Sequence, residues 1–231
     1  MLVYGKNVAI EALKKKEIIK KVYLSNDFSS EEIKKEIISN NIPIIYDKKE
    51  KIDGLVKTLS QGIVLDIENI HFKYLEDLKE DDNANFVVIL DHIEDPQNLG
   101  AIIRTCNCAG VDYIIKPNKR SSSVTATVVK ASAGSALSTK IVEVANLCNT
   151  IRELKKKGYW IVGTDSEGVD YTKINYKGKI AIVIGSEGRG LTKIVRDNCD
   201  FIASIPLKGS VNSLNASVAC GIVLYEVVKQ R

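Results

Sequence analysis

Asn98, Gly100 and Arg104 stand at a spacing that could place a polar site beside a helix. They follow the apolar run FVVIL (86–90), and Arg104 is the first arginine of a chain that until then uses only lysine for positive charge. An arginine can hold a phosphate through its planar fork, whereas lysine offers a point charge. At helical spacing Arg104 falls on a different flank from the apolar face, and Asn98 is a candidate N-cap. A capping asparagine and a merely solvated arginine remain the simpler alternative.

The second candidate is IAIVIGSEGRGL (180–191), an apolar strand that enters a loop with three glycines. It lacks the Gly-Lys-Ser/Thr of a phosphate-binding loop, and its glycine order differs from the dinucleotide fingerprint. Glu187 inside the loop would repel a phosphate but would tolerate a neutral nucleoside or a cationic ligand. The alternative is a tight turn between a strand and a helix, with no ligand.

The third candidate, IPLKGSVNSLNASVACGIVLYE (205–226), joins a strand to the last helix through a polar loop. Ser213 and Asn215 are residue types that cap helices. Small residues then follow, which would let a backbone or a ligand approach closely: Ala216, Ala219, Cys220 and Gly221. The alternative is a capped, close-packed helix without a ligand.

Two other stretches have simpler interpretations. The apolar stripe of Val218, Ile222 and Tyr225 could form a dimer face. KASAGSAL (130–137) carries small residues around Gly134, for which helix packing is favoured over a phosphate or ribose contact.

The arrangement of the elements predicts an α/β protein with two units. After residue 85, short apolar strands alternate with helices, which is typical of a parallel sheet covered on both faces. Ligands bind beyond the carboxyl ends of such strands, where Asp91, Thr164, Gly185 and Pro206 stand. We expect a small α/β unit over residues 1–75, a polar linker over 76–85 and the parallel-sheet domain over 86–231.

Composition excludes several classes of protein. The net charge is +4, which is compatible with RNA binding without demanding it. No apolar run reaches the roughly 18 residues of a membrane span, and the N-terminus lacks a signal-peptide layout. Five cysteines without a CxxC pair, and two histidines, argue against zinc and against a disulfide framework. We expect a cytoplasmic protein without a metal.

Together and in this order, the three motifs resemble the SpoU/TrmH family of RNA 2′-O-ribose methyltransferases, in the SPOUT superfamily. The resemblance covers nearly all of residues 85–231. The N-terminal unit resembles the family's ribosomal-protein-like RNA-binding domain through VYGKNVAIEAL (3–13) and SQGIVLDIE (60–68). These stretches are most similar to the bacterial 23S rRNA (guanosine-2′-O-)-methyltransferase subgroup, RlmB. That subgroup has His-Gln-Gly where this chain has Ser60-Gln61-Gly62.

The resemblance implies a fold, a cofactor and a site. The sheet would be threaded into a trefoil knot, S-adenosylmethionine would be the methyl donor, and the C-terminal domain would form a homodimer. The implied cofactor contacts are Gly185, Gly188, Ile205, Leu207, Ser213 and Leu214. The implied catalytic residues are Asn98, Arg104, Glu187 and Asn215.

The implied reaction is attack of a ribose 2′-oxygen on an activated methyl group, which needs no metal. The family proposal makes Arg104 the base, yet a guanidinium has a pKa above about 12. We favour an electrostatic role, in which Arg104 grips the adjacent phosphate and stabilises the developing alkoxide. The N-terminal unit would grip RNA, with Lys14–Lys16 and Lys20–Lys21 as candidate phosphate contacts.

Three alternatives remain beside a 23S rRNA methyltransferase. The first is a transfer-RNA ribose methyltransferase of the same family, which the added N-terminal domain disfavours. The second is a non-catalytic RNA-binding protein that kept the fold, which the intact motifs argue against. The third is a nucleotide-binding dehydrogenase, which the missing fingerprint disfavours.

Overall fold

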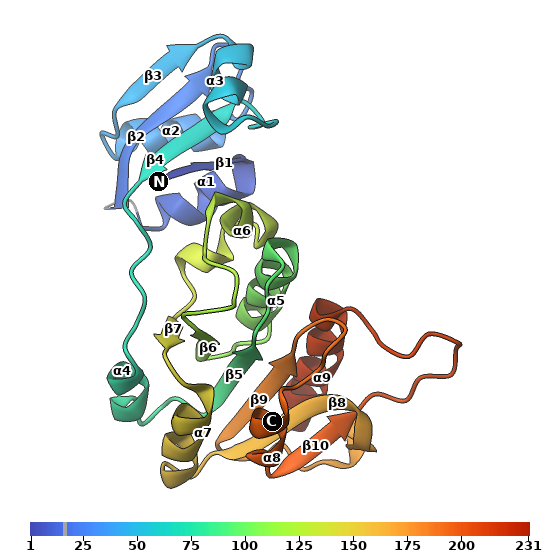
Figure 1. Cartoon of the computed structure of the whole chain (residues 1–231). Helices are drawn as coiled ribbons and strands as arrows, with labels where there is room; N and C mark the ends of the chain where they lie inside the picture. Colours follow the sequence, from blue (N-terminus) through green and yellow to red (C-terminus); the bar gives the residue numbers. More distant parts are fainter. Residues whose placement is uncertain (16–17) are drawn as a thin grey trace. The chain divides into compact units, whose positions relative to one another are not determined.

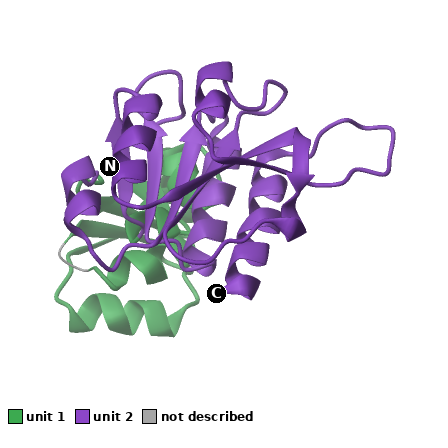
Figure 2. Cartoon of the chain, turned by 90° about the horizontal axis from the view of Figure 1, so that it is seen from below, with its two compact units in different colours: residues 1–71, 124–138 green, residues 72–123, 139–231 purple. Residues whose placement is uncertain are grey.

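The computed structural model describes residues 1–15 and 18–231, which form two compact units. One unit contains residues 1–71 and 124–138, and the other contains residues 72–123 and 139–231 (Figure 2). None of the helices in the described ranges is long and apolar enough to span a bilayer.

The first unit has a four-stranded sheet in the order β1-β4-β2-β3 (Figure 1). Only β2 and β3 are parallel. The strands are β1 (Leu2–Tyr4), β2 (Ile19–Ser25), β3 (Ile44–Asp47) and β4 (Ile63–Ile67). The helices that follow them along the chain are α1 (Lys6–Leu13), α2 (Glu31–Ser39) and α3 (Lys49–Val56). The predicted small α/β unit is confirmed, although the sequence pattern missed β1 and α3.

The segment 130–137 belongs to this first unit, as part of α6 (Ala126–Ala131) and η2 (Ser135–Leu137). Gly134 has φ 93°, and a Cβ atom there would lie 2.8 Å from the Cβ of Glu11 and 3.1 Å from the Cα of Val8. Glycine is therefore needed because helix α1 approaches closely. The favoured interpretation, helix packing, is confirmed.

The second unit has a six-stranded sheet in the order β10-β8-β9-β5-β6-β7, and all its strand pairs are parallel (Figure 1). The strands are β5 (Phe86–Asp91), β6 (Tyr113–Pro117), β7 (Ile141–Val144), β8 (Trp160–Asp170), β9 (Ile180–Gly185) and β10 (Phe201–Ser204). The strands expected in the apolar runs are all present: FVVIL (86–90), DYIIK (112–116), IVEVA (141–145), WIVGT (160–164), IAIVIG (180–185) and FIASIP (201–206). The central strands β5 and β9 are buried along their whole length, as parallel strands covered on both faces require.

Helices cover both faces of this sheet. The helices are α4 (Leu75–Glu80), α5 (Pro96–Cys108), α7 (Leu147–Lys156), α8 (Lys193–Asp197) and α9 (Ala216–Gln230), with a short turn at η3 (Tyr171–Lys173). Side chains of α4, α7 and α8 pack in one core cluster with Val87 and Ile89 of β5. The alternate residues Val88 and Leu90 point to the opposite face and are also fully buried. Helices α5 and α9 pack against each other, and α9 packs against β9.

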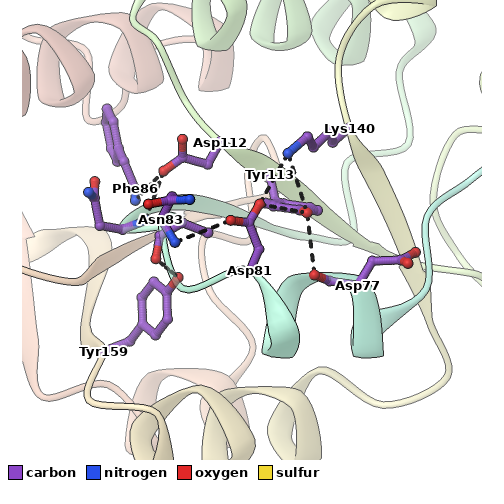
Figure 3. A network of polar contacts seen from close by, with 10 residues as sticks. Asp77, Asp81, Asn83, Phe86, Asp112, Tyr113, Lys140 and Tyr159 are labelled. Atoms are coloured by element: carbon purple, nitrogen blue, oxygen red, sulfur yellow. Dashed lines mark hydrogen bonds and ion pairs between the residues drawn. The ribbon is translucent and has the colours of Figure 1, made fainter.

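The expected linker, residues 76–85, is an ordered part of the second unit (Figure 3). Helix α4 takes up its first half and buries Leu78, and the Asp81 carboxylate accepts hydrogen bonds from Tyr113 Oη (3.0 Å) and Lys140 Nζ (3.1 Å). The Tyr159 hydroxyl donates to the Ala84 carbonyl at 2.6 Å. The polar residues that indicated a linker are therefore partners in a hydrogen-bond network.

Candidate active site

The middle of β8 and the carboxyl ends of β9 and β10 surround a cavity of about 310 Å³. Thr164 of β8, Gly185 at the end of β9 and Ile205 after β10 contribute to its wall. All six residues predicted to hold the cofactor line this one cavity: Gly185, Gly188, Ile205, Leu207, Ser213 and Leu214. The structure thus brings together residues that lie up to about 30 positions apart in the chain, at the edge where parallel sheets bind ligands.

The loop after β9 forms the floor of this cavity as a tight turn. Ser186 and Gly190 exchange backbone hydrogen bonds of 3.0 and 2.9 Å. Gly188 and Gly190 have φ angles of 82° and 64°, in the left-handed region that favours glycine. A Cβ atom on Gly185 would lie 2.3 Å from the carbonyl carbon of Gly190, so no side chain fits there. These glycines therefore bring backbone right up to the cavity.

The wall formed by α9 is lined by small residues. Ala216 and Ala219 line the cavity, whereas Cys220 is fully buried, as is Cys106 of α5. A Cβ atom on Gly221 would lie 3.7 Å from Thr105 Cγ2 of α5. The small residues of the third motif thus serve two purposes, since two border the cavity and two allow the close packing of α9 on α5.

Asn98, Glu187 and Asn215 form one chain of side-chain hydrogen bonds. Asn215 Nδ2 donates to Asn98 Oδ1 at 2.8 Å, and Asn98 Nδ2 donates to Glu187 Oε2 at 2.7 Å. Asn98 is 6% exposed, so little water competes for these bonds. Three motifs that the sequence separates by up to 117 positions therefore meet through one buried amide.

The prediction that Asn98 caps helix α5 is wrong. The N-cap is Asp95, whose carboxylate accepts from the backbone N–H of Gln97 at 3.0 Å, and Pro96 opens the helix. Proline at the first helical position fits because its missing N–H needs no partner there. Because Asn98 does not cap the helix, its side chain can bond both Glu187 and Asn215. The prediction for Asn215 is confirmed, since it caps α9 by accepting from the Ser217 N–H at 2.9 Å.

A second cavity, of about 570 Å³, adjoins the first. Ser186, Glu187 and Arg189 line both, so the Glu187 carboxylate stands at their common border. Asn98 also lines the second cavity, together with the cations Arg120 and Lys193 and the acids Glu94 and Asp95. Its three cations, Arg189 among them, are groups that can bind a phosphate.

Arg104 lies outside both cavities of its own chain. Its side chain is exposed on α5, beside Thr105, which packs against α9. The apolar face expected on this helix comprised Leu99, Ile102, Ile103, Cys106 and Ala109. The first four are completely buried, whereas Ala109, at the end of the helix, is partly exposed. The geometry of one chain therefore joins Asn98, Glu187 and Asn215, but it does not bring Arg104 to them.

Sequence reasoning missed an ion pair that shapes the first cavity. Asp165 lines the cavity, and its carboxylate pairs with the guanidinium of Arg196, which also donates to the Glu167 carbonyl at 3.2 Å. In the sequence, Asp165 directly follows the apolar run WIVGT (160–164), and this position could have marked Asp165 as a candidate site residue. Arg196 neutralises the charge of Asp165. Glu187, the other carboxylate that lines this cavity, instead accepts a hydrogen bond from the neutral amide of Asn98.

The lysines predicted to contact phosphate have different surroundings. Lys14 pairs with Glu11 at 2.5 Å, and Lys15 Nζ donates to the Leu137 carbonyl at 3.1 Å. Lys20 is exposed, and Lys21 Nζ lies 5.4 Å from the ring centre of Tyr23, whose hydroxyl raises the pKa of Lys21. Lys16 lies outside the described residues.

None of the five cysteines lines either of these two cavities. Burial raises the pKa of Cys199 to about 12, and it raises the pKa of Cys106 well above the usual value. A thiol must lose its proton to attack or to bind a metal. Within residues 1–15 and 18–231, no three His, Cys, Asp or Glu side chains gather as metal ligands.

Comparison with known proteins assigns both parts of the chain. Residues 85–225 match the SpoU rRNA methylase family, and residues 2–72 match the domain described as RNA 2′-O ribose methyltransferase substrate binding. A Staphylococcus saprophyticus protein assigned to the TrmH family of tRNA/rRNA methyltransferases is 40% identical, covering 100% of this chain and 96% of its own. A Bacillus subtilis protein with the same assignment is 36% identical, covering 99% and 95%.

Solved structures share the fold. The AdoMet-bound rRNA methyltransferase from Sinorhizobium meliloti is 28% identical, with a TM-score of 0.83, covering 99% of this chain and 86% of that one. The SpoU methyltransferase AviRb from Streptomyces viridochromogenes, 24% identical, has a TM-score of 0.83 and covers 100% and 90%, which shows the shared fold. With the motifs in place and both units matched, the chain belongs to the SpoU rRNA methylase family.

Proposed function

We propose that this protein transfers a methyl group from S-adenosylmethionine to a ribose 2′-hydroxyl of RNA. The observation that carries the proposal is the hydrogen-bond chain from Asn215 through Asn98 to Glu187, at the border of two adjoining cavities. Family membership supports the methylation of RNA. The AdoMet-bound relative, 28% identical over nearly the whole chain, supports the cofactor.

The first cavity fits S-adenosylmethionine by size and chemistry. About 310 Å³ lies within the range of small-molecule sites, and Gly185 leaves a cradle that a Cβ atom would fill. Ile205, Leu207 and Leu214 offer apolar surface to an adenine ring. When bound, S-adenosylmethionine supplies a methyl group on a positively charged sulfur, and the Glu187 carboxylate is suited to face such a cation.

The second cavity would hold the RNA nucleotide. Arg120, Arg189 and Lys193 would bind its phosphates, and the shared border at Glu187 would set the ribose beside the methyl donor. Positioning of this kind supplies a large part of the rate of a two-reactant transfer. Asn98 and Asn215 act by fixing Glu187, and Arg104 would reach RNA from the exposed flank of α5.

An rRNA guanosine, in 23S rRNA, is the target we propose. Relatives that match over the whole chain support ribosomal RNA, since the Sinorhizobium protein is described as an rRNA methyltransferase. The tRNA-modifying enzyme from A. aeolicus, 30% identical, covers 68% of this chain with a TM-score of 0.59. Transfer RNA remains the second candidate, because the Staphylococcus and Bacillus relatives are assigned to tRNA/rRNA methyltransferases.

The N-terminal unit would contribute RNA contacts, and one cavity there supports this. It measures about 330 Å³ and includes Lys6, Lys49 and Gln61. Ser60, which stands where the 23S subgroup has histidine, is fully buried, and its hydroxyl lies 2.5 Å from Asp53 Oδ1. Ser60 therefore fixes the start of the Gln61–Gly62 turn, and Gln61 and the lysines would touch RNA.

We also propose a homodimer through α9 and a location in the cytoplasm. The α9 side chains Val218, Tyr225 and Val228 are 49%, 53% and 41% exposed, and they recur at helical spacing. Light scattering after gel filtration should give twice the chain mass of 25.5 kDa, and Tyr225→Lys should shift it toward the single-chain mass. The trefoil knot stays a prediction.

Labelled S-adenosylmethionine tests the proposed function directly. The purified protein should transfer label to unmodified 23S rRNA, and alkaline hydrolysis should leave the labelled nucleotide joined to its 3′ neighbour, since a 2′-O-methyl blocks cleavage. Label on bulk transfer RNA would keep the chemistry and change the target. Label in a product that alkali still cleaves would contradict 2′-O-methylation.

A further inference from the structure

Trp160, the only tryptophan of the chain, is exposed at the start of strand β8. Its neighbours Tyr159 and Ile161 are buried in the core cluster on the α7 side of the sheet, so the alternation of a strand directs Trp160 to the other side. Its ring centre lies 5.7 Å from that of Phe201, the first residue of β10, with the two planes tilted by 46°. Trp160 is 54% exposed and Phe201 is 43% exposed. An exposed aromatic pair rimmed by charged residues is a candidate interaction surface.

The backbone around the two rings is fixed by hydrogen bonds. Trp160 N–H donates to the Lys179 carbonyl at 2.9 Å, which joins the start of β8 to the start of β9. Asp200 directly precedes β10, and its carboxylate accepts from the Ile161 N–H at 2.8 Å and from Lys155 Nζ at 2.7 Å. The charge of this carboxylate is therefore neutralised. Rings on such a fixed backbone lose little conformational freedom when a ligand stacks on them.

The segments that lead into β8 and β9 are basic. Residues 154–161 and 171–180 contain no Asp or Glu, and their lysines are Lys155, Lys156, Lys157, Lys173, Lys177 and Lys179. Lys157 and Lys177 are exposed, and neither forms an ion pair with any described residue. Their ammonium groups are therefore available to the phosphates of a ligand.

This combination of side chains favours RNA over another protein. The core of a protein–protein interface is depleted in lysine, whereas surfaces that bind single-stranded nucleic acid combine aromatic rings with cations. The surface lies at the amino ends of β8 and β9. Gly185 of the candidate active site ends β9 (Ile180–Gly185), roughly 17 Å farther along at about 3.3 Å per residue. A flanking segment of an RNA can thus occupy this surface while the target nucleotide occupies the second cavity.

We propose that Lys157, Trp160, Lys177 and Phe201 form a docking surface for an unpaired RNA segment that flanks the target nucleotide. A base stacks on the Trp160 ring, and the two lysines bind neighbouring phosphates. The surface raises the affinity for RNA and takes no part in methyl transfer, so its loss raises KM and leaves kcat unchanged. The inference rests on the proposed function, because it requires RNA as the substrate.

The fluorescence of Trp160 reports whether a base stacks on it, because no other tryptophan contributes to the emission. We expect unmodified 23S rRNA to quench this emission in a saturable titration. Unchanged emission, while filter binding shows that the RNA is fully bound, would overturn the proposal. Emission that shifts when the protein is diluted without RNA would place a second copy of the chain on this surface and would also overturn it.

Substitutions separate a docking role from a structural one. We expect Trp160→Ala to raise KM for unmodified 23S rRNA about tenfold, as for the loss of one stacked base, with kcat and the affinity for S-adenosylmethionine unchanged. Trp160→Phe keeps a ring and should keep most of the RNA affinity. Lys157→Gln should reduce the salt dependence of RNA binding, whereas the control Lys35→Gln, also exposed but on α2, should not. A wild-type KM in Trp160→Ala, or an equal loss in Trp160→Phe, would refute the stacking role.

The wild-type protein distinguishes failure of this inference from failure of the proposed function. If the wild type neither binds RNA nor transfers a methyl group to it, the proposed function fails and the docking surface fails with it. If the wild type methylates RNA and Trp160→Ala does so equally at every RNA concentration, only the docking surface is refuted.

Discussion

Asn98 donates its amide N–H to Glu187 across 2.7 Å, which joins helix α5 to the loop after β9. The two residues are 89 positions apart, and Asn98 is also the acceptor for Asn215. One amide therefore uses its donor and its acceptor to set two other motifs. Asn98 thereby holds Glu187, which lines both cavities.

Asn98→Ala should impair methyl transfer more than folding. Removing the amide leaves Glu187 and Asn215 without their partner, and a hydrogen bond to a charged group is worth about 1.5–3 kcal/mol. We expect a 10- to 100-fold lower kcat, by conversion of that energy, and a melting temperature within a few degrees of wild type. Asn107→Ala, on the exposed flank of the same helix, is the control. Unchanged kcat in Asn98→Ala would contradict a positioning role.

Gly185→Ala should weaken cofactor binding. The added Cβ would meet the Gly190 carbonyl carbon at 2.3 Å, so the loop must shift away from its place in the cavity wall. We expect affinity for S-adenosylmethionine, measured by calorimetry, to fall at least tenfold. Gly54→Ala is matched, because a Cβ there meets nothing within 4 Å. Equal affinities for both variants would show that the cofactor binds elsewhere.

Arg104→Lys should lose most of the activity and little of the cofactor affinity. The exposed guanidinium lies outside the cofactor cavity, and lysine keeps the charge but not the planar fork that grips a phosphate. Single-turnover methyl transfer measures the loss, and Arg152→Lys, exposed on α7, is the control. Near-normal single-turnover rates for Arg104→Lys would refute the electrostatic role.

Asp81→Asn should destabilise the protein at neutral pH and not in acid. Hydrogen bonds from Lys140 and then Tyr113 to the charged carboxylate lower the pKa of Asp81. Because the folded pKa is lowered, the stabilisation is complete above the unfolded pKa of about 3.9 and is lost as pH falls through the folded value. The melting temperature of Asp81→Asn should lie below wild type at pH 7, and the gap should close toward pH 3. Asp82→Asn should show no gap, and a gap that persists in acid would contradict this account.

The sequence predicted elements wherever apolar periodicity was clear. FVVIL and IAIVIG become β5 and β9 because a parallel strand buried on both faces needs an unbroken apolar run. The strand β1 was not predicted, because a strand of three residues is too short to show an alternation of apolar and polar side chains. Residues 76–85 were misjudged for a different reason, since Asp81 and Asp112 find partners distant in the chain.

The site was predictable as a set of residues and not as a geometry. The six residues predicted to contact the cofactor line one cavity, because a glycine loop and a strand end can be recognised from neighbouring residues in the sequence. The partners of Asn98 depend on where α5 begins. Asp95 caps the helix and Pro96 is its first residue, so the Asn98 side chain is not used as the cap.

The central claim is methyl transfer at a site held together by Asn98 and Glu187. The most direct test compares wild type with Glu187→Gln in transfer of label from S-adenosylmethionine to unmodified 23S rRNA, with the product mapped to a nucleotide. The account predicts one 2′-O-methylated guanosine with the wild type and a loss of at least tenfold with Glu187→Gln. Equal transfer by both proteins, or methylation of a base instead of a ribose, would contradict it.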